Sequence, residues 1–133
     1  MSVAWELRGP VLVVTTSGAY TNEEVDTALG AGAADPRRVP GTLVLFDGRQ
    51  SQAKLTKGDM EWRAARLESL PRLGFGPRVA FVVNAQPHRF GLGRMLELRL
   101  EPRGVDVRIF SDMDQAWAWL AGAQAPEGCD GAD

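Results

Sequence analysis

The sequence predicts a single α/β domain: a single-layer, mostly parallel five-stranded sheet that opens with an N-terminal hairpin. Short β-prone runs alternate with segments of helical periodicity in the order ββαβαβαβα. Such alternation is typical of helices that cross over between parallel strands. The length of 133 residues, with 44% hydrophobic and 24% charged residues, suits one globular core.

The predicted hairpin lies at the start of the chain. Residues 3–8 and 11–16 are β-prone and have the length of strands. Gly9-Pro10, between them, is a dipeptide typical of turns. We therefore expect two adjacent strands that run antiparallel.

The first helix is predicted by its capping sequence. Thr21 and Glu24 have the spacing of a capping box, with Thr21 as the N-cap, and apolar residues follow at helical intervals. The helix should end near Ala34. Gly30 and Gly32 each weaken its second half by about 1 kcal/mol relative to alanine, unless close packing requires them.

A buried strand and a second helix occupy the middle of the chain. Residues 42–46 are continuously apolar, as in a strand covered on both faces, and the strand should end in a turn at Asp47-Gly48-Arg49. The second helix should run from near Thr56 to Leu70, because Pro71 disfavours helical geometry in the residue before it. Its expected inward stripe comprises Met60, Ala64 and Leu67.

The remainder of the chain continues the alternation. Residues 79–83 predict another buried strand, residues 90–100 a third helix, and residues 105–110 an edge strand with alternating apolar and polar side chains. We place one domain over residues 1–121 and a small, acidic, disordered tail over residues 122–133. A final helix should begin at Ser111 or Asp112, with a core stripe of Met113, Ala116, Trp117 and Leu120.

Composition excludes several classes of protein. Cys129 is the only cysteine, so no internal disulfide can form, and we expect neither a metal cluster nor a cofactor. The N-terminus lacks the continuous apolar core of a signal peptide. No run approaches the roughly 20 apolar residues of a transmembrane helix. These features predict a cytoplasmic protein without a transmembrane segment.

Charge is distributed unevenly. The net charge is −2, yet residues 49–108 carry ten Arg and two Lys against six acidic residues. Arginine suits two-point recognition of phosphate or carboxylate, although solvated helix faces account for the same excess. The segment has no recognition-helix motif and no interleaved stacking aromatics, so we expect no binding to nucleic acid.

Several short features of the sequence carry a resemblance to a known family. They are Trp5, Gly18-x-Tyr20-Thr21, Leu43-Val44-Leu45-Phe46-Asp47, Arg94-Met95 and Ala116-x-x-Trp119-Leu120. Together they resemble the SpoIIAA-like family over about residues 3–121. That family belongs with the STAS domains (sulphate transporter and anti-sigma factor antagonist) and is structurally related to Sec14/CRAL-TRIO lipid-binding domains. The resemblance implies a STAS-like fold and a module for protein interaction or ligand sensing.

The sequence departs from this family where a regulatory serine would lie. Anti-sigma factor antagonists carry an Asp-Ser-Ser-Gly-like element at the start of the second helix, where a serine is phosphorylated. Here the corresponding residues are Leu55-Thr56-Lys57-Gly58-Asp59-Met60. Thr56 is therefore the remaining candidate phosphoacceptor.

Candidate ligand-binding residues follow the predicted strands, because ligands of open parallel sheets bind at the carboxyl ends of the strands. They are Asp47, Arg49, Ser51, His88 and Arg89. His88 and Arg89 oppose the dipole of the helix they precede, and a bound anion or Asp47 would relieve this. Ser51, His88 and Asp47 have the residue types of a triad, but no nucleophile elbow accompanies them. We expect no catalytic residue and no enzyme.

Candidate partner-binding residues lie on the second and third helices. Trp62 is about 140° from the centre of the inward stripe at ~100° per residue, which favours a side chain directed away from the core. Tryptophan and arginine are favoured at interfaces. The leading hypothesis is a partner protein or a homodimer; the alternative is a small apolar anion or lipid between these helices, and packing of Trp62 on the third helix explains the same pattern. The residues are Trp62, Arg63, Arg66, Phe90 and Arg94.

Overall fold

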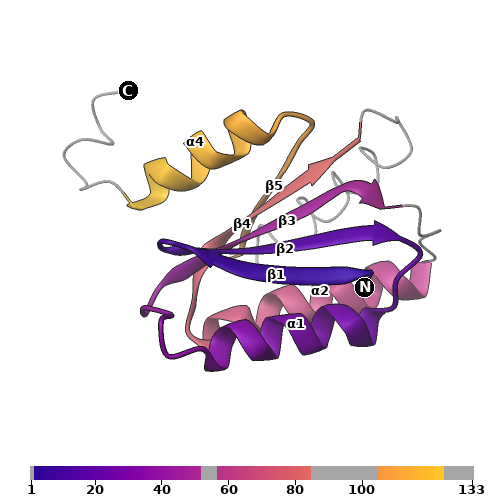
Figure 1. The fold of residues 1–133 in the computed structure, drawn as a ribbon, viewed down its shortest axis with the longest axis horizontal. Helices are drawn as coiled ribbons and strands as arrows, with labels where there is room; N and C mark the ends of the chain where they lie inside the picture. The colour runs from indigo at the N-terminus through magenta and orange to yellow at the C-terminus, as the bar shows by residue number, and fades with distance from the viewer. Residues whose placement is uncertain (1, 52–56, 85–104, 125–133) are drawn as a thin grey trace.

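The fold is a five-stranded sheet flanked by helices (Figure 1). The computed structural model describes residues 2–51, 57–84 and 105–124. Strands follow one another across the sheet in sequence order, with the first pair antiparallel and the others parallel. This confirms the predicted fold class. The elements are β1 (Val3–Arg8), β2 (Val11–Gly18), α1 (Asn22–Ala34), β3 (Thr42–Ser51), α2 (Lys57–Ser69), a 3-10 helix (Leu70–Leu73), β4 (Phe75–Val83), β5 (Asp106–Phe110) and α4 (Met113–Gln124).

Helix α1 has the predicted beginning and end. The Thr21 hydroxyl accepts a hydrogen bond from the Glu24 amide, and the Glu24 carboxylate accepts one from the Thr21 amide, which completes the capping box. A β-carbon at Gly32 would lie 2.6 Å from the Leu12 Cδ2 atom, whereas one at Gly30 would meet open space. Close packing therefore explains Gly32 but not Gly30.

The two faces of the sheet carry separate apolar clusters, because alternate residues of a strand point to opposite faces. Helices α1 and α2 cover one face and α4 the other (Figure 1). Right-handed crossovers between strands that follow in order place α1 and α2 on the same face. The first cluster includes Leu12, Val14, Val44, Phe46, Val79, Leu29 and Leu67; the second includes Val13, Leu45, Ala80, Val82, Ala116 and Leu120.

Three boundaries differ from the predictions. Strand β3 continues through Asp47-Gly48-Arg49 to Ser51, because its second half still pairs with Ser17 and Gly18 of β2. The predicted turn there is therefore wrong. Strand β4 begins at Phe75, four residues earlier than expected, and α4 extends to Gln124, past the predicted domain limit at residue 121.

Other details agree with the sequence. Pro71 lies in the first turn of the 3-10 helix, where its missing amide is tolerated, and α2 ends just before that helix. In β5, Val107 and Ile109 are buried while Asp106 and Arg108 are exposed, as predicted for an edge strand. The predicted third helix and the tail beyond residue 124 lie outside the described residues. Within the described residues, no helix has the length and apolar character that crossing a membrane requires.

Candidate functional site

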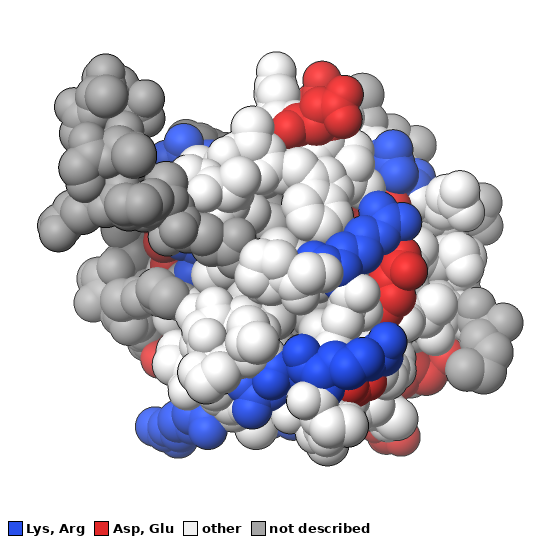
Figure 2. Space-filling view, turned by 60° about the vertical axis from the view of Figure 1, so that its left-hand side comes forward, with Lys and Arg blue, Asp and Glu red and all other residues white. Residues whose placement is uncertain are grey.

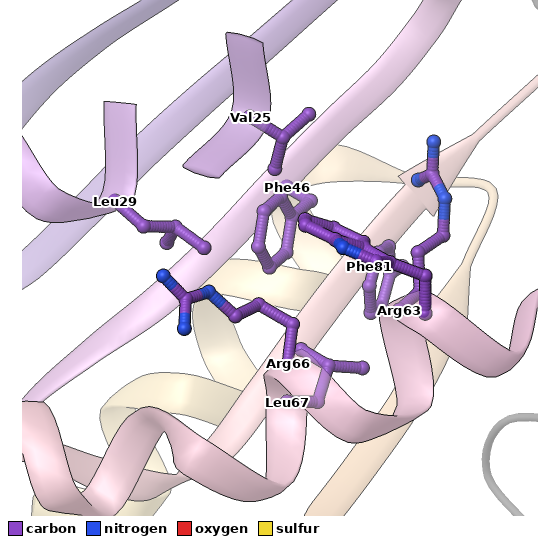
Figure 3. Close-up of a pocket in the computed structure, with 8 residues that line it drawn as sticks. Val25, Leu29, Phe46, Arg63, Arg66, Leu67 and Phe81 are labelled. Atoms are coloured by element: carbon purple, nitrogen blue, oxygen red, sulfur yellow. The ribbon is translucent and has the colours of Figure 1, made fainter. Parts of the chain in front are cut away.

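A shallow groove lies between α1 and α2, above the sheet (Figure 3). It is open to solvent, and its room for water-sized groups is about 20 Å³, enough for one or two water molecules. The groove combines an apolar floor with cationic side chains. Its lining residues are Val25, Leu29, Phe46, Trp62, Arg63, Arg66, Leu67 and Phe81.

The floor is formed by aromatic and aliphatic side chains. Phe46 of β3 and Phe81 of β4 are paired across the parallel strands, and their rings stack with centroids 4.7 Å apart and planes 12° from parallel. Val25 and Leu29 lie one turn apart on α1, so they project from the same side of that helix. Phe46 and Leu29 are almost fully buried. The groove thus ends on the hydrophobic core.

Arg63 and Arg66 supply the charge. They lie three residues apart on α2 and therefore share a helix face. The Nη2 atom of Arg63 donates to the Tyr20 hydroxyl at 2.7 Å, and the guanidinium lies over the Tyr20 ring at 5.1 Å from its centroid. The Nη2 atom of Arg66 forms an ion pair with Asp26. Figure 3 shows Arg66 reaching from α2 toward Leu29 of α1.

Each arginine has one buried nitrogen without a hydrogen-bond partner. The Nε atoms of Arg63 and Arg66 are buried and have no hydrogen-bond partner among the described residues. A buried donor without a partner costs about 1–3 kcal/mol. One carboxylate oxygen of Asp26, Oδ1, is likewise buried without a hydrogen-bond partner in the described part of the chain, so the polar atoms beside the groove that lack one are two donors and one acceptor.

Polar contacts hold α1 and α2 together beside the groove. The Asn22 side-chain amide donates to the Asp59 carboxylate at 3.2 Å, and Asp26 pairs with Arg66. These side chains therefore connect the two helices that border the groove.

Trp62 does not have the predicted orientation. Its side chain is half-buried and lines the groove, whereas we expected it to face away from the core. The physical reason is that α1 lies beside α2 on the same face of the sheet, so the flank of α2 faces its neighbour. Trp62 is nevertheless not a member of either core cluster formed by the described residues.

The candidates at the carboxyl end of β3 are largely engaged with one another. The guanidinium of Arg49 donates to both carboxylate oxygens of Asp47, at 2.9 and 3.0 Å. These hydrogen bonds raise the pKa of Arg49 above its ordinary value. Ser51 is buried, with 4% of its surface exposed. Asp47 and Arg49 therefore form an ion pair with each other within β3.

The other predicted site residues are not tested by the structure. Thr56, His88, Arg89, Phe90 and Arg94 lie outside the described residues. The anion site at the third helix, the triad and the phosphoacceptor consequently stay predictions. Residues 2–51, 57–84 and 105–124 contain no cluster of three His, Cys, Asp or Glu side chains suited to a metal ion.

Sequence reasoning selected Trp62, Arg63 and Arg66 but missed the residues opposite them. Tyr20, Asp26, Phe46 and Phe81 meet them only because β2, β3 and β4 follow in order across the sheet. The order of the strands shows that these residues lie opposite the α2 side chains, whereas the periodicity of the sequence alone does not.

Charges elsewhere are mixed. On the face that Figure 2 shows, acidic side chains of the described residues lie beside the basic ones, among uncharged side chains. This pattern differs from the continuous basic surface that binding to a phosphate backbone favours.

Comparisons with known proteins identify the fold. No protein-family model matches the chain, and no curated protein matches its sequence. Among solved structures, it is similar to an uncharacterised protein of the DUF3478 family with a SpoIIAA-like fold, from Shewanella loihica PV-4. The TM-score is 0.58 at 20% identity, over 89% of this chain and 91% of that one. The chain therefore has the SpoIIAA-like fold that the sequence resemblance predicted.

Proposed function

We propose that this chain is a non-enzymatic binding module that engages a partner protein, or a second copy of itself, through the groove between α1 and α2. The observation that carries the proposal is an open apolar groove whose two arginines each retain a buried, unpaired Nε–H group. Tryptophan and arginine are the residue types most enriched at energetic centres of protein interfaces. The groove presents both.

The size of the groove favours a protein over a small molecule. Pockets for small ligands usually measure about 300–1,000 Å³ and enclose most of the ligand. Here the room is about 20 Å³ and opens to solvent. A side chain that projects from the surface of another protein can bind in a groove this shallow. The alternative of a lipid between the second and third predicted helices concerns residues that the structure does not describe.

A non-catalytic role agrees with the engagement of Asp47. Its carboxylate binds Arg49 through both oxygens, an arrangement that fixes the strand rather than orients a general base. The single cysteine, Cys129, suits the reducing cytoplasm, where we place the proposed module.

Comparative capture tests this function. The full chain, Trp62→Ala and a control, Arg72→Ala, are used as baits in host lysate, and light scattering follows self-association across concentrations. Arg72 is exposed on the 3-10 helix beyond α2. We expect wild type and Arg72→Ala to bind the same species. Trp62→Ala should bind it at least tenfold more weakly, since a central interface tryptophan contributes about 2 kcal/mol or more.

Two results would count against the proposed function. One is a strictly monomeric chain that captures nothing reproducibly. The other is a partner, or a dimer, whose affinity is unchanged by Trp62→Ala, because binding would then use another surface.

A further inference from the structure

Building on the proposed function, we infer that the groove binds an acidic segment of a partner protein. The segment places a carboxylate against Arg63 and Arg66 and an adjacent apolar side chain over the stacked rings of Phe46 and Phe81. A carboxylate next to an apolar side chain defines the chemistry of the partner, which the fold alone does not specify.

The donors in the groove select a carboxylate. Both Nη2 atoms already contact the chain itself, at Tyr20 and at Asp26, whereas both Nε–H groups and one carboxylate oxygen of Asp26 are buried without a hydrogen-bond partner in the part that the structure describes. Hydrogen bonds from arginine to a carboxylate are charge-assisted and roughly twice as strong as neutral ones. An Asp or Glu side chain is therefore the protein group that best satisfies these donors.

The balance of charge points the same way. The eight described residues that line the groove include two arginines and no acidic residue. Asp26, at the edge, neutralises part of that charge through Arg66. The remaining positive charge complements an anionic segment, and attraction of this kind specifies a partner and accelerates its association.

The apolar floor of the groove favours an apolar side chain next to the carboxylate. The Phe46 and Phe81 rings are stacked, and Phe81 stays partly exposed at the groove. One aromatic or aliphatic side chain would cover them. The room of about 20 Å³ holds one or two water molecules, which is far less than an acyl chain requires.

Asp26 acts in this scheme as an internal competitor. Its carboxylate occupies Arg66 in the free chain, with 41% of its own side chain exposed. An incoming carboxylate has to share or displace that contact. Asp26→Asn should therefore strengthen binding of an acidic segment, the opposite of what loss of an ordinary interface residue does.

A peptide selection tests the inference. A random dodecapeptide display library is selected on the full chain, and synthetic versions of the enriched peptides are titrated by fluorescence anisotropy. We expect enriched peptides to pair Asp or Glu with Phe, Leu or Trp. Affinity should fall at least tenfold in Arg63→Gln/Arg66→Gln, rise about three- to tenfold in Asp26→Asn, and weaken with added salt. Arg72→Gln is the matched control.

Folding of each variant is checked by circular dichroism. Arg66→Lys, which keeps the charge but removes the guanidinium Nε–H, gives a second and milder test. We expect it to bind more weakly than wild type and more tightly than Arg66→Gln.

Several outcomes would overturn the inference. They are a library that yields no binder, enriched peptides without acidic residues, affinities unchanged in the double variant, or displacement of the peptides by dodecanoate at lower concentrations than by acidic peptides. If capture still depends on Trp62 while the peptides lack acidic residues, the proposed function stands and this inference fails. If neither Trp62 nor the arginines affect any binding, both fail.

Discussion

Two clusters of tryptophan and arginine lie on opposite faces of the sheet and differ in how completely their polar groups are used. On the α4 face, Trp119 is flanked by Arg78 and Arg108, whose guanidinium carbons lie 4.9 and 5.4 Å from its ring centroid. Arg78 also donates to the Trp119 carbonyl oxygen at 3.1 Å and approaches Asp106 at 3.5 Å. On the α2 face, Arg63 and Arg66 keep unpaired donors.

This difference separates a structural cluster from a candidate interface. The residue types are the same, so composition and motif do not distinguish the two clusters. What differs is whether the chain itself satisfies the buried polar groups. Trp119 packs against the second apolar cluster and Phe110, whereas Trp62 borders an open groove. The groove is therefore the place where another molecule can supply the missing hydrogen-bond partners.

The largest expected effect is the loss of Trp119. Trp119→Ala removes its packing on the second cluster and two cation–π contacts, and we expect unfolding to become easier by about 3 kcal/mol. Trp62→Ala should cost about 1 kcal/mol, because its side chain, although half-buried like that of Trp119, belongs to neither apolar cluster. Urea titrations of the two variants measure the difference. Equal losses would place Trp62 in the core and remove the contrast between the faces.

Most of the fold follows from local sequence patterns. The capping box at Thr21 and the alternation in β5 predicted their elements because they depend on neighbours in sequence. The end of β3 was mispredicted because Asp47-Gly48-Arg49 has turn chemistry, yet pairing with β2 and β4 extends the strand. Tertiary pairing overrides a local preference there.

Only half of the candidate site could be predicted from the sequence. The α2 residues stand out by type, since Trp62, Arg63 and Arg66 interrupt an amphipathic pattern. Their counterparts come from the loop that follows β2 and from α1, β3 and β4. Pairing of Phe46 with Phe81 depends on strand order and register, which periodicity leaves undetermined. Long-range geometry, rather than residue type, decides that half.

A smaller effect compares the arginines directly. Arg78→Met should destabilise the chain by about 1–2 kcal/mol, because it loses a hydrogen bond to a carbonyl and a contact with Trp119. Arg66→Met should leave stability unchanged or raise it by up to about 1 kcal/mol, since it removes an unpaired buried donor together with a partly exposed ion pair. Thermal and urea unfolding compare the two. A loss in Arg66→Met as large as in Arg78→Met would mean that the α2 arginine is structural.

Two glycines of α1 test whether the groove is a local gap or a sign of loose packing across the whole α1 side. Gly30→Ala should stabilise the chain by about 0.5–1 kcal/mol, because alanine favours a helix and open space surrounds that position. Gly32→Ala gains the same helix propensity but places a methyl group 2.6 Å from Leu12, which is fully buried. Overpacking costs about 1–3 kcal/mol, which outweighs the gain in helix propensity, so the net change should be a loss of up to about 2.5 kcal/mol. Opposite signs in urea titrations would show that α1 packs tightly on the sheet and that the opening lies only between α1 and α2. Stabilisation by both substitutions would show that Leu12 moves freely, and the groove would then be one part of a generally loose face.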